Sequence, residues 1–151
     1  MNLQTYPNEA VYVPDMLVTL VALSNFTWQC DDRYLSTVNE WLNKAKKKWT
    51  DKETGILKSF LDYNGTELSE PIKGSYTALI CYYLTFVDKD FAHEQDELLK
   101  KHFMQRSPFA GIQEYYDRKC WLGMDIDSGP IIFNLSPSGT AFAIGAATYF
   151  G

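Results

Sequence analysis

The sequence is poor in the residue types that build metal centres and disulfide frameworks. Its 151 residues include only three cysteines and two histidines. Cys30, Cys81 and Cys120 do not have the paired spacing of zinc ligands, and an odd number of cysteines does not fit a closed set of disulfides. Cys81 lies among apolar neighbours, as a small buried residue would. We therefore expect reduced thiols, no metal and no other cofactor, as in a cytoplasmic protein.

Basic residues and long apolar runs are also scarce. Lys and Arg number 14 against 19 Asp and Glu, a net charge of −5, whereas nucleic-acid-binding domains usually show a basic face. The apolar run 11–26 is interrupted by Pro14 and Asp15 and is too short to span a bilayer. The first ten residues contain no Lys or Arg, unlike a secretory signal. The sequence therefore predicts neither a nucleic-acid partner nor a membrane span.

Common catalytic motifs are missing as well. The sequence contains no glycine-rich phosphate loop and no Ser/His/Asp set of a nucleophilic hydrolase. What remains is the composition of an ordinary globular protein, 46% apolar and 22% charged. A chain of this length buries a core of its own, so we expect residues 1–151 to form a single domain.

Alternating apolar and charged helices are the dominant pattern. Pro14 stands where the first turn of a helix tolerates proline, and the lysines at the end of 32–49 suit the negative end of a helix. Long connections, 50–73 and 107–136, follow the charged helices. The predicted helices are 14–26, 75–86 and 137 to the chain end, which are apolar, and 32–49 and 89–106, which are charged. The tryptophans of the first half, Trp28, Trp41 and Trp49, are expected in the core.

This pattern repeats with a period of about 60 residues. Gly74-Ser75 and Gly139-Thr140 begin apolar helices about 65 positions apart, and Gly55-Ile56 and Gly111-Ile112 lie about 56 apart in the long connections. The Gly-Ile segments look like short strands. Repeated units stack because one unit cannot bury its own apolar face. The sequence therefore predicts an all-α fold of helical hairpins, with short β-strand pieces in the long connections.

Three segments carry a resemblance to a known architecture: Trp-Thr-Asp-Lys-Glu-Thr-Gly at 49–55, Lys-Gly-Ser at 73–75, and 121–139. With the apolar inner and charged outer helices, they resemble the (α/α) toroids of the six-hairpin glycosidase group and its relatives, including linalool dehydratase-isomerase-like domains. A complete toroid of that group has six hairpins. This sequence contains about two and a half, at 13–49, 75–106 and 137–151. The resemblance therefore implies an incomplete toroid, either the remainder of a longer chain or a homo-oligomer.

The candidate catalytic residues lie in the second long connection. Both connections lead into the N-terminal ends of apolar helices, so we expect them at one rim, where helical toroids bind ligands. Glycoside hydrolysis needs paired carboxylates, one as acid and one as base or nucleophile. We therefore select Asp125, Asp127 and Glu114. Two alternatives remain: Asp127 begins a turn with Ser-Gly-Pro, or Asp125 and Asp127 form a weak metal site.

Residues near these carboxylates are candidates for substrate binding. Trp121, Tyr115 and Tyr116 carry rings that stack on a sugar face, although packing between loop and helices explains them equally well. The polar candidates of the same stretch are Asp117, Arg118 and Ser128. Cys120, beside Arg118, is an alternative catalytic group for a lyase or dehydratase.

Two functions are compatible with these patterns. The first is a segment of a carbohydrate-active enzyme, a glycosidase or a lyase, that uses acidic residues of the loop 114–130 on a carbohydrate ligand. The placement of His93 and His102 on a charged outer helix argues against histidine-based chemistry such as sugar epimerisation. The alternative function is a non-catalytic helical-repeat module for binding or self-assembly, because an incomplete ring does not enclose a pocket.

Overall fold

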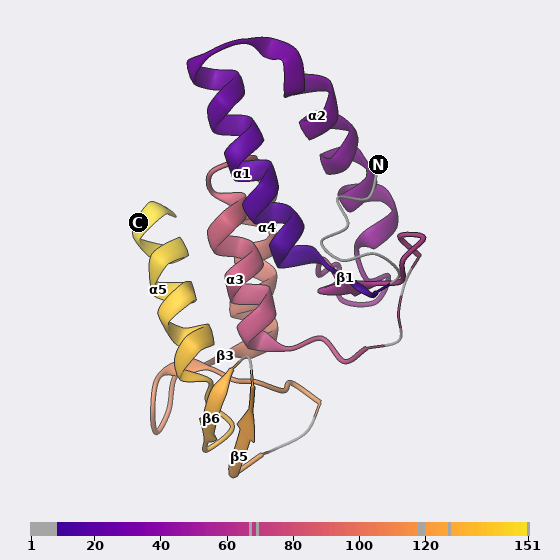
Figure 1. Ribbon diagram of the computed structural model, residues 1–151. Helices are drawn as coiled ribbons and strands as arrows, with labels where there is room; N and C mark the ends of the chain where they lie inside the picture. Colours follow the sequence, from indigo (N-terminus) through magenta and orange to yellow (C-terminus); the bar gives the residue numbers. More distant parts are fainter. Residues whose placement is uncertain (1–8, 67, 69, 118–119, 127, 151) are drawn as a thin grey trace.

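The computed structural model describes residues 9–66, 68, 70–117, 120–126 and 128–150. The helices found there alternate in character along the chain (Figure 1). They are α1 (Val13–Gln29), α2 (Leu35–Lys44), α3 (Gly74–Leu84), α4 (Lys89–Phe103) and α5 (Pro137–Phe150). Each overlaps a range that the sequence predicts to be helical, although α1 continues to Gln29 rather than ending at residue 26.

The helix boundaries follow local chemistry. The carboxylate of Asp88 accepts a hydrogen bond from Phe91 N (3.0 Å) and so caps α4. Asp31 accepts one from Arg33 N (2.9 Å) at the start of a short 3-10 turn, Asp32–Tyr34. The range 32–49 is therefore not one regular helix: it begins with this turn and ends in a π-helical turn, Ala45–Trp49. That wider turn places Trp49 against Trp41, with 5.4 Å between ring centroids.

Short antiparallel strand pairs connect the helices. β1 (Val11–Tyr12) pairs with β2 (Phe60–Leu61), and β3 (Met104–Gln105) pairs with β4 (Gly111–Ile112). The fourth helix therefore ends at Phe103 and not at residue 106, because the next two residues join this pair. A third pair, β5 (Leu122–Asp125) and β6 (Gly129–Ile132), forms a hairpin. The sequence patterns did not predict these two strands.

The helices form two layers (Figure 1). The apolar helices make the inner row, in which α3 contacts both α1 and α5. The charged helices lie behind them, α2 against α1 and α4 against α3. This is the predicted arrangement of inner and outer helices. No helix in the described ranges combines the length and apolar character that crossing a membrane requires.

Two apolar cores lie between the layers, and α3 contributes to both. The first joins the first two hairpins and includes Leu17, Leu20, Trp41, Trp49, Ile80 and Phe91. The second lies where α5 and the second connection meet α3 and α4, and includes Ile56, Ala78, Cys81, Leu99, Phe103 and Ala146. Cys81 is fully buried, as predicted. The prediction for Trp28 is wrong, because this residue lies at the end of α1 and is 84% exposed.

Close packing at the start of the inner row depends on a glycine. A Cβ at Gly139 would lie 2.9 Å from Ser75 Cα, a backbone atom that cannot rotate away. We predict that Gly139→Ala separates the N-terminal ends of α3 and α5 and lowers the free energy of unfolding by about 1–3 kcal/mol, the usual effect of overpacking. Chemical denaturation measures this. The exposed substitution Ala147→Ser on the same helix should change stability by less than about 0.5 kcal/mol; equal effects of the two would contradict the prediction.

Candidate functional site

The start of α3 is crossed by the backbone of the second long connection. Gly74 N donates a hydrogen bond to Glu114 O (3.0 Å), and Glu114 N donates one to Asn134 O (2.7 Å). A Cβ at Gly74 would lie on Gln113 O, so no other residue allows this approach. The contact fixes Glu114 beside the first turn of an inner helix, at the rim that the sequence predicts.

Glu114 is the most enclosed carboxylic acid of this rim. The residue is 0% exposed, and its Oε1 accepts a hydrogen bond from Ser75 Oγ (3.0 Å). Its Oε2 is buried and has no hydrogen-bond partner among the described residues. Burial raises the pKa of Glu114, and this effect outweighs the opposing hydrogen bond from Ser75 and the positive charge of Lys73. The protonated form of Glu114 is therefore favoured more than that of a solvent-exposed glutamate.

Lys73 and Asp125 form an ion pair beside Glu114. Lys73 Nζ lies 2.5 Å from Asp125 Oδ2 and 4.9 Å from the centre of the Tyr76 ring. Burial acts to lower the pKa of Lys73, but the hydrogen bond and charge of Asp125, with further contributions from Tyr115 and Glu114, raise it overall. Lys73 is thus stabilised as an ammonium group by its pairing with Asp125. The ion pair attaches β5 to the start of α3 across 52 positions of sequence.

The structure brings together only some of the predicted site residues. Glu114 and Asp125 are close enough for the charge of Asp125 to act on Glu114. Tyr115 is buried next to Glu114, and its carbonyl accepts a hydrogen bond from Asn134 Nδ2 (2.7 Å). Ser128 is buried too, and its carbonyl accepts one from Ser138 Oγ (3.1 Å). Both residues are thus buried, with their backbone carbonyls hydrogen-bonded.

The other predicted residues are more exposed or are not described. Asp117 is exposed, and the half-exposed Tyr116 makes edge contacts with the rings of His102 and Phe103. Asp127 and Arg118 lie outside the described residues. Sequence reasoning missed Lys73 as a site residue, although its Lys-Gly-Ser segment is part of the resemblance to the toroids.

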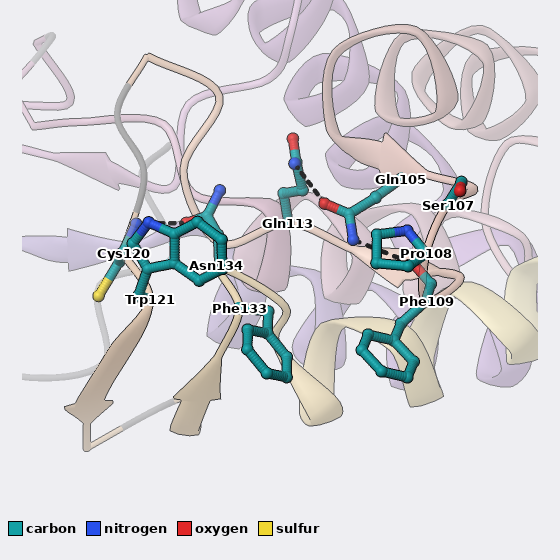
Figure 2. Close-up of a pocket in the computed structure, with 9 residues that line it drawn as sticks. All are labelled: Gln105, Ser107, Pro108, Phe109, Gln113, Cys120, Trp121, Phe133 and Asn134. Carbon is teal, nitrogen blue, oxygen red and sulfur yellow. Dashed lines mark hydrogen bonds between the residues drawn. The ribbon is translucent and has the colours of Figure 1, made fainter.

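A pocket of about 300 Å³ has Gln113, the residue that precedes Glu114, in its lining (Figure 2). Its aromatic wall contains Phe109 and Phe133, stacked with 5.5 Å between centroids, and Trp121, edge-on to Phe133 at 5.8 Å. Three amide side chains supply its polar surface, and Cys120, Ser107 and Pro108 complete it. The amides belong to Gln105, Gln113 and Asn134.

Hydrogen bonds orient these amides. Gln113 Nε2 donates to Gln105 Oε1 (2.9 Å), and Gln105 Nε2 donates to Phe109 O (3.1 Å), as Figure 2 shows. Cys120 N donates to Asn134 Oδ1 (3.4 Å). Gln113 therefore faces the pocket while the adjacent Glu114 faces Ser75, so one backbone segment serves both the pocket and the carboxylate cluster. Of these residues the sequence pointed only to Trp121 and, as an alternative, Cys120.

Possible metal ligands and histidines are dispersed in the described part of the chain. It contains no group of three or more His, Cys, Asp or Glu side chains placed to hold a metal ion. His93 and His102 both lie on the outer helix α4, as predicted. His93 is exposed and contacts the Phe150 ring, whereas His102 lies at the rim end of α4 against Tyr116.

Comparison with known proteins relates this fold to a carbohydrate enzyme. No protein-family model and no curated protein matches the sequence. Among solved structures, the cellobiose 2-epimerase of Spirochaeta thermophila is similar, with a TM-score of 0.74 and 15% sequence identity. The match covers 96% of this chain and 39% of the epimerase chain, so most of that enzyme has no counterpart here. The likeness confirms the prediction of a partial (α/α) toroid.

The buried acid of the site generates a pH prediction. Burial raises the pKa of Glu114 in the folded state above its ordinary value of 4.5, which applies to the unfolded state. Between the unfolded-state pKa and the folded-state pKa, the folded protein therefore binds more protons than the unfolded protein. The contribution of protonated Glu114 to the free energy of unfolding is complete below pH 4.5 and is lost as the pH rises through the folded-state pKa. We predict that the free energy of unfolding of the native protein falls relative to that of Glu114→Gln as the pH rises from about 4 to 8.

Urea denaturation of both proteins across this range measures the effect. Glu94→Gln, which removes an exposed carboxylate on α4, should show no such pH-dependent difference. A constant difference between native protein and Glu114→Gln would show that Glu114 keeps an ordinary pKa.

Proposed function

We propose that this chain is part of an (α/α)-toroid enzyme that binds and processes a carbohydrate at the N-terminal end of α3. The observation that carries the proposal is the placement of buried Glu114 beside the Lys73–Asp125 ion pair, at the rim of the inner helices. The fold of cellobiose 2-epimerase supports the substrate class. Enzymes often surround two acidic groups with different environments so that one holds a proton and the other does not.

The two carboxylic acids would take different roles in the reaction. Glu114, whose pKa is raised, suits the acid that gives a proton to the leaving oxygen of a glycoside. Asp125, paired with an ammonium group, suits the charged base or nucleophile. In a lyase, Asp125 would instead take a proton from carbon. Asp127 remains a third candidate on the sequence argument alone.

The pocket of Figure 2 would bind sugar units next to this pair. Sugars present hydroxyl groups at their edges and C–H groups on their faces, so they fit amides combined with aromatic rings. Gln105, Gln113 and Asn134 provide the amides, and Trp121 provides an exposed ring. The exposed Tyr116 and Asp117 would extend the binding surface, whereas Tyr115 and Ser128, which are buried, would position the loop. Arg118 remains a binding candidate on the sequence argument alone.

Two exposed tryptophans allow a matched binding test. Trp121 lines the pocket and is 68% exposed, whereas Trp28 is 84% exposed at the far end of α1. We predict that the protein binds cellobiose or another member of a panel of neutral oligosaccharides. Trp121→Ala should weaken binding about tenfold through loss of ring stacking, while Trp28→Ala should not change it. Titration calorimetry measures both affinities. Failure of the whole panel to bind, or equal losses for the two variants, would contradict the proposal.

Turnover tests the catalytic assignment separately. On a bound saccharide that the protein converts, we expect Asp125→Asn and Glu114→Gln each to lower kcat by about 100-fold or more, the usual contribution of a general acid or base. Glu94→Gln, on the exposed side of α4, should leave kcat unchanged. Full activity of Asp125→Asn would remove this residue from the mechanism. Product separation by chromatography distinguishes hydrolysis from elimination.

A further inference from the structure

α3, the middle helix of the inner row, shows how completely an inner helix is buried when it has neighbours. α3 contains no charged residue and lies between α1 and α5, with α4 behind it. None of its residues is exposed. An inner helix of this composition is therefore fully covered when it has a neighbour on each side.

α5 has the composition of α3 but leaves one face open. It contains no charged residue either, and Pro137, Ala141, Ile144 and Thr148 are exposed along one face, Ile144 at 64%. Its opposite face packs on α3, where Gly145 lies close to the Tyr82 ring. The open face forms an almost wholly apolar groove of about 490 Å³ with part of the second connection. The groove residues outside α5 are Phe109, Ile132, Phe133 and Leu135.

α1 leaves a second face open at the other end of the row, with one charged residue, the partly exposed Asp15, in its first turn. Met16, Leu17 and Leu20 are buried, whereas Val18, Ala22 and Asn25 are exposed on the opposite face, Val18 at 47%. These three residues follow the i, i+4, i+7 spacing of one helix face. Each end of the inner row therefore presents an open helix face, and the one on α5 is almost wholly apolar. Large apolar patches are uncommon on the surfaces of monomeric proteins.

We infer that copies of this chain associate head to tail, with the open face of α5 in one copy packed against the open face of α1 in the next. The inner helices run parallel, and each packs against the next one along the row (Figure 1). A second copy placed beyond α5 repeats this relation, and Asp15, in the first turn of α1, is the one charged residue on the two helix faces that would meet. One copy offers a different face at each end, so the contact is heterologous.

The expected association is modest in strength. α5 has 14 residues, which at 1.5 Å per residue gives a contact about 21 Å long. A single contact of this length falls near the weak end of specific interfaces, so sedimentation velocity should extend to about 300 µM protein. We expect the native chain to form species larger than its 17.3 kDa monomer as concentration rises.

Two variants block the opposite ends of the contact. Ile144→Glu places a charge on the α5 face and Val18→Glu places one on the α1 face, both at exposed positions that leave the core intact. We expect each variant alone to remain a monomer. A mixture of the two should form a one-to-one dimer, because one variant keeps an intact α1 face and the other an intact α5 face. Glu94→Lys, on the outer helix α4, should associate like the native chain.

Circular dichroism confirms that each variant is folded, and Ala22→Glu and Thr148→Glu provide a second pair at exposed positions of the same faces. A native chain that stays monomeric throughout the concentration range would overturn the inference. So would a mixture of the blocked variants that stays monomeric, or a blocked variant that still associates, because each result is incompatible with pairing of α5 with α1.

Discussion

The contact between Gly74 and the backbone at 113–114 determines where every group of the candidate site lies. It places a peptide group directly over the first turn of α3, at a distance that excludes any side chain at position 74. The consequence is that Glu114 is held next to Ser75 and is removed from water. The positive charge of Lys73 acts on Glu114 against this effect of burial, and Lys73 forms its ion pair with Asp125 of β5. Thus one backbone contact organises three segments that are distant in the sequence.

The site combines two kinds of surface that are separated by one segment of chain. Charged groups gather on the side of α3, whereas aromatic rings and amides gather on the side of the pocket. The amides are hydrogen-bonded to one another and to the backbone, which fixes the direction of their remaining donors and acceptors. Such preorganisation lowers the entropy lost when a polar ligand binds. A neutral polar ligand in the pocket would therefore meet donors and acceptors whose directions are already fixed.

Sequence patterns predicted the helical repeat well because it rests on long segments. Residues 75–86 and 89–106 differ so strongly in polarity that their inner and outer positions follow directly from the need to bury apolar faces. The β5–β6 hairpin was missed because β6 begins with Gly129-Pro130, a pair that is typical of turns. Glu114 and Asp125 were selected as candidates through their chemistry. Lys73, Gln105 and Gln113 were not, because a single lysine or glutamine has no signature until the fold gives it a partner.

Trp28 shows a second limit of sequence reasoning. Its apolar character alone suggested the core, but its position at the last turn of α1 carries it beyond the helices that would cover it. Whether an apolar side chain is buried depends on the neighbours that the fold provides, and an inner row with two ends has fewer neighbours there than in its middle.

The sharing of α3 between both apolar cores has a consequence for the energetics of the molecule. Ile80 and Leu84 belong to the core of the first two hairpins, whereas Ala78 and Cys81 belong to the core that joins α5. The stability of each core therefore depends on the same helix of 11 residues. Loosening of either core exposes part of α3 and weakens the other, so the chain should unfold cooperatively even though its repeated units contact mainly their neighbours.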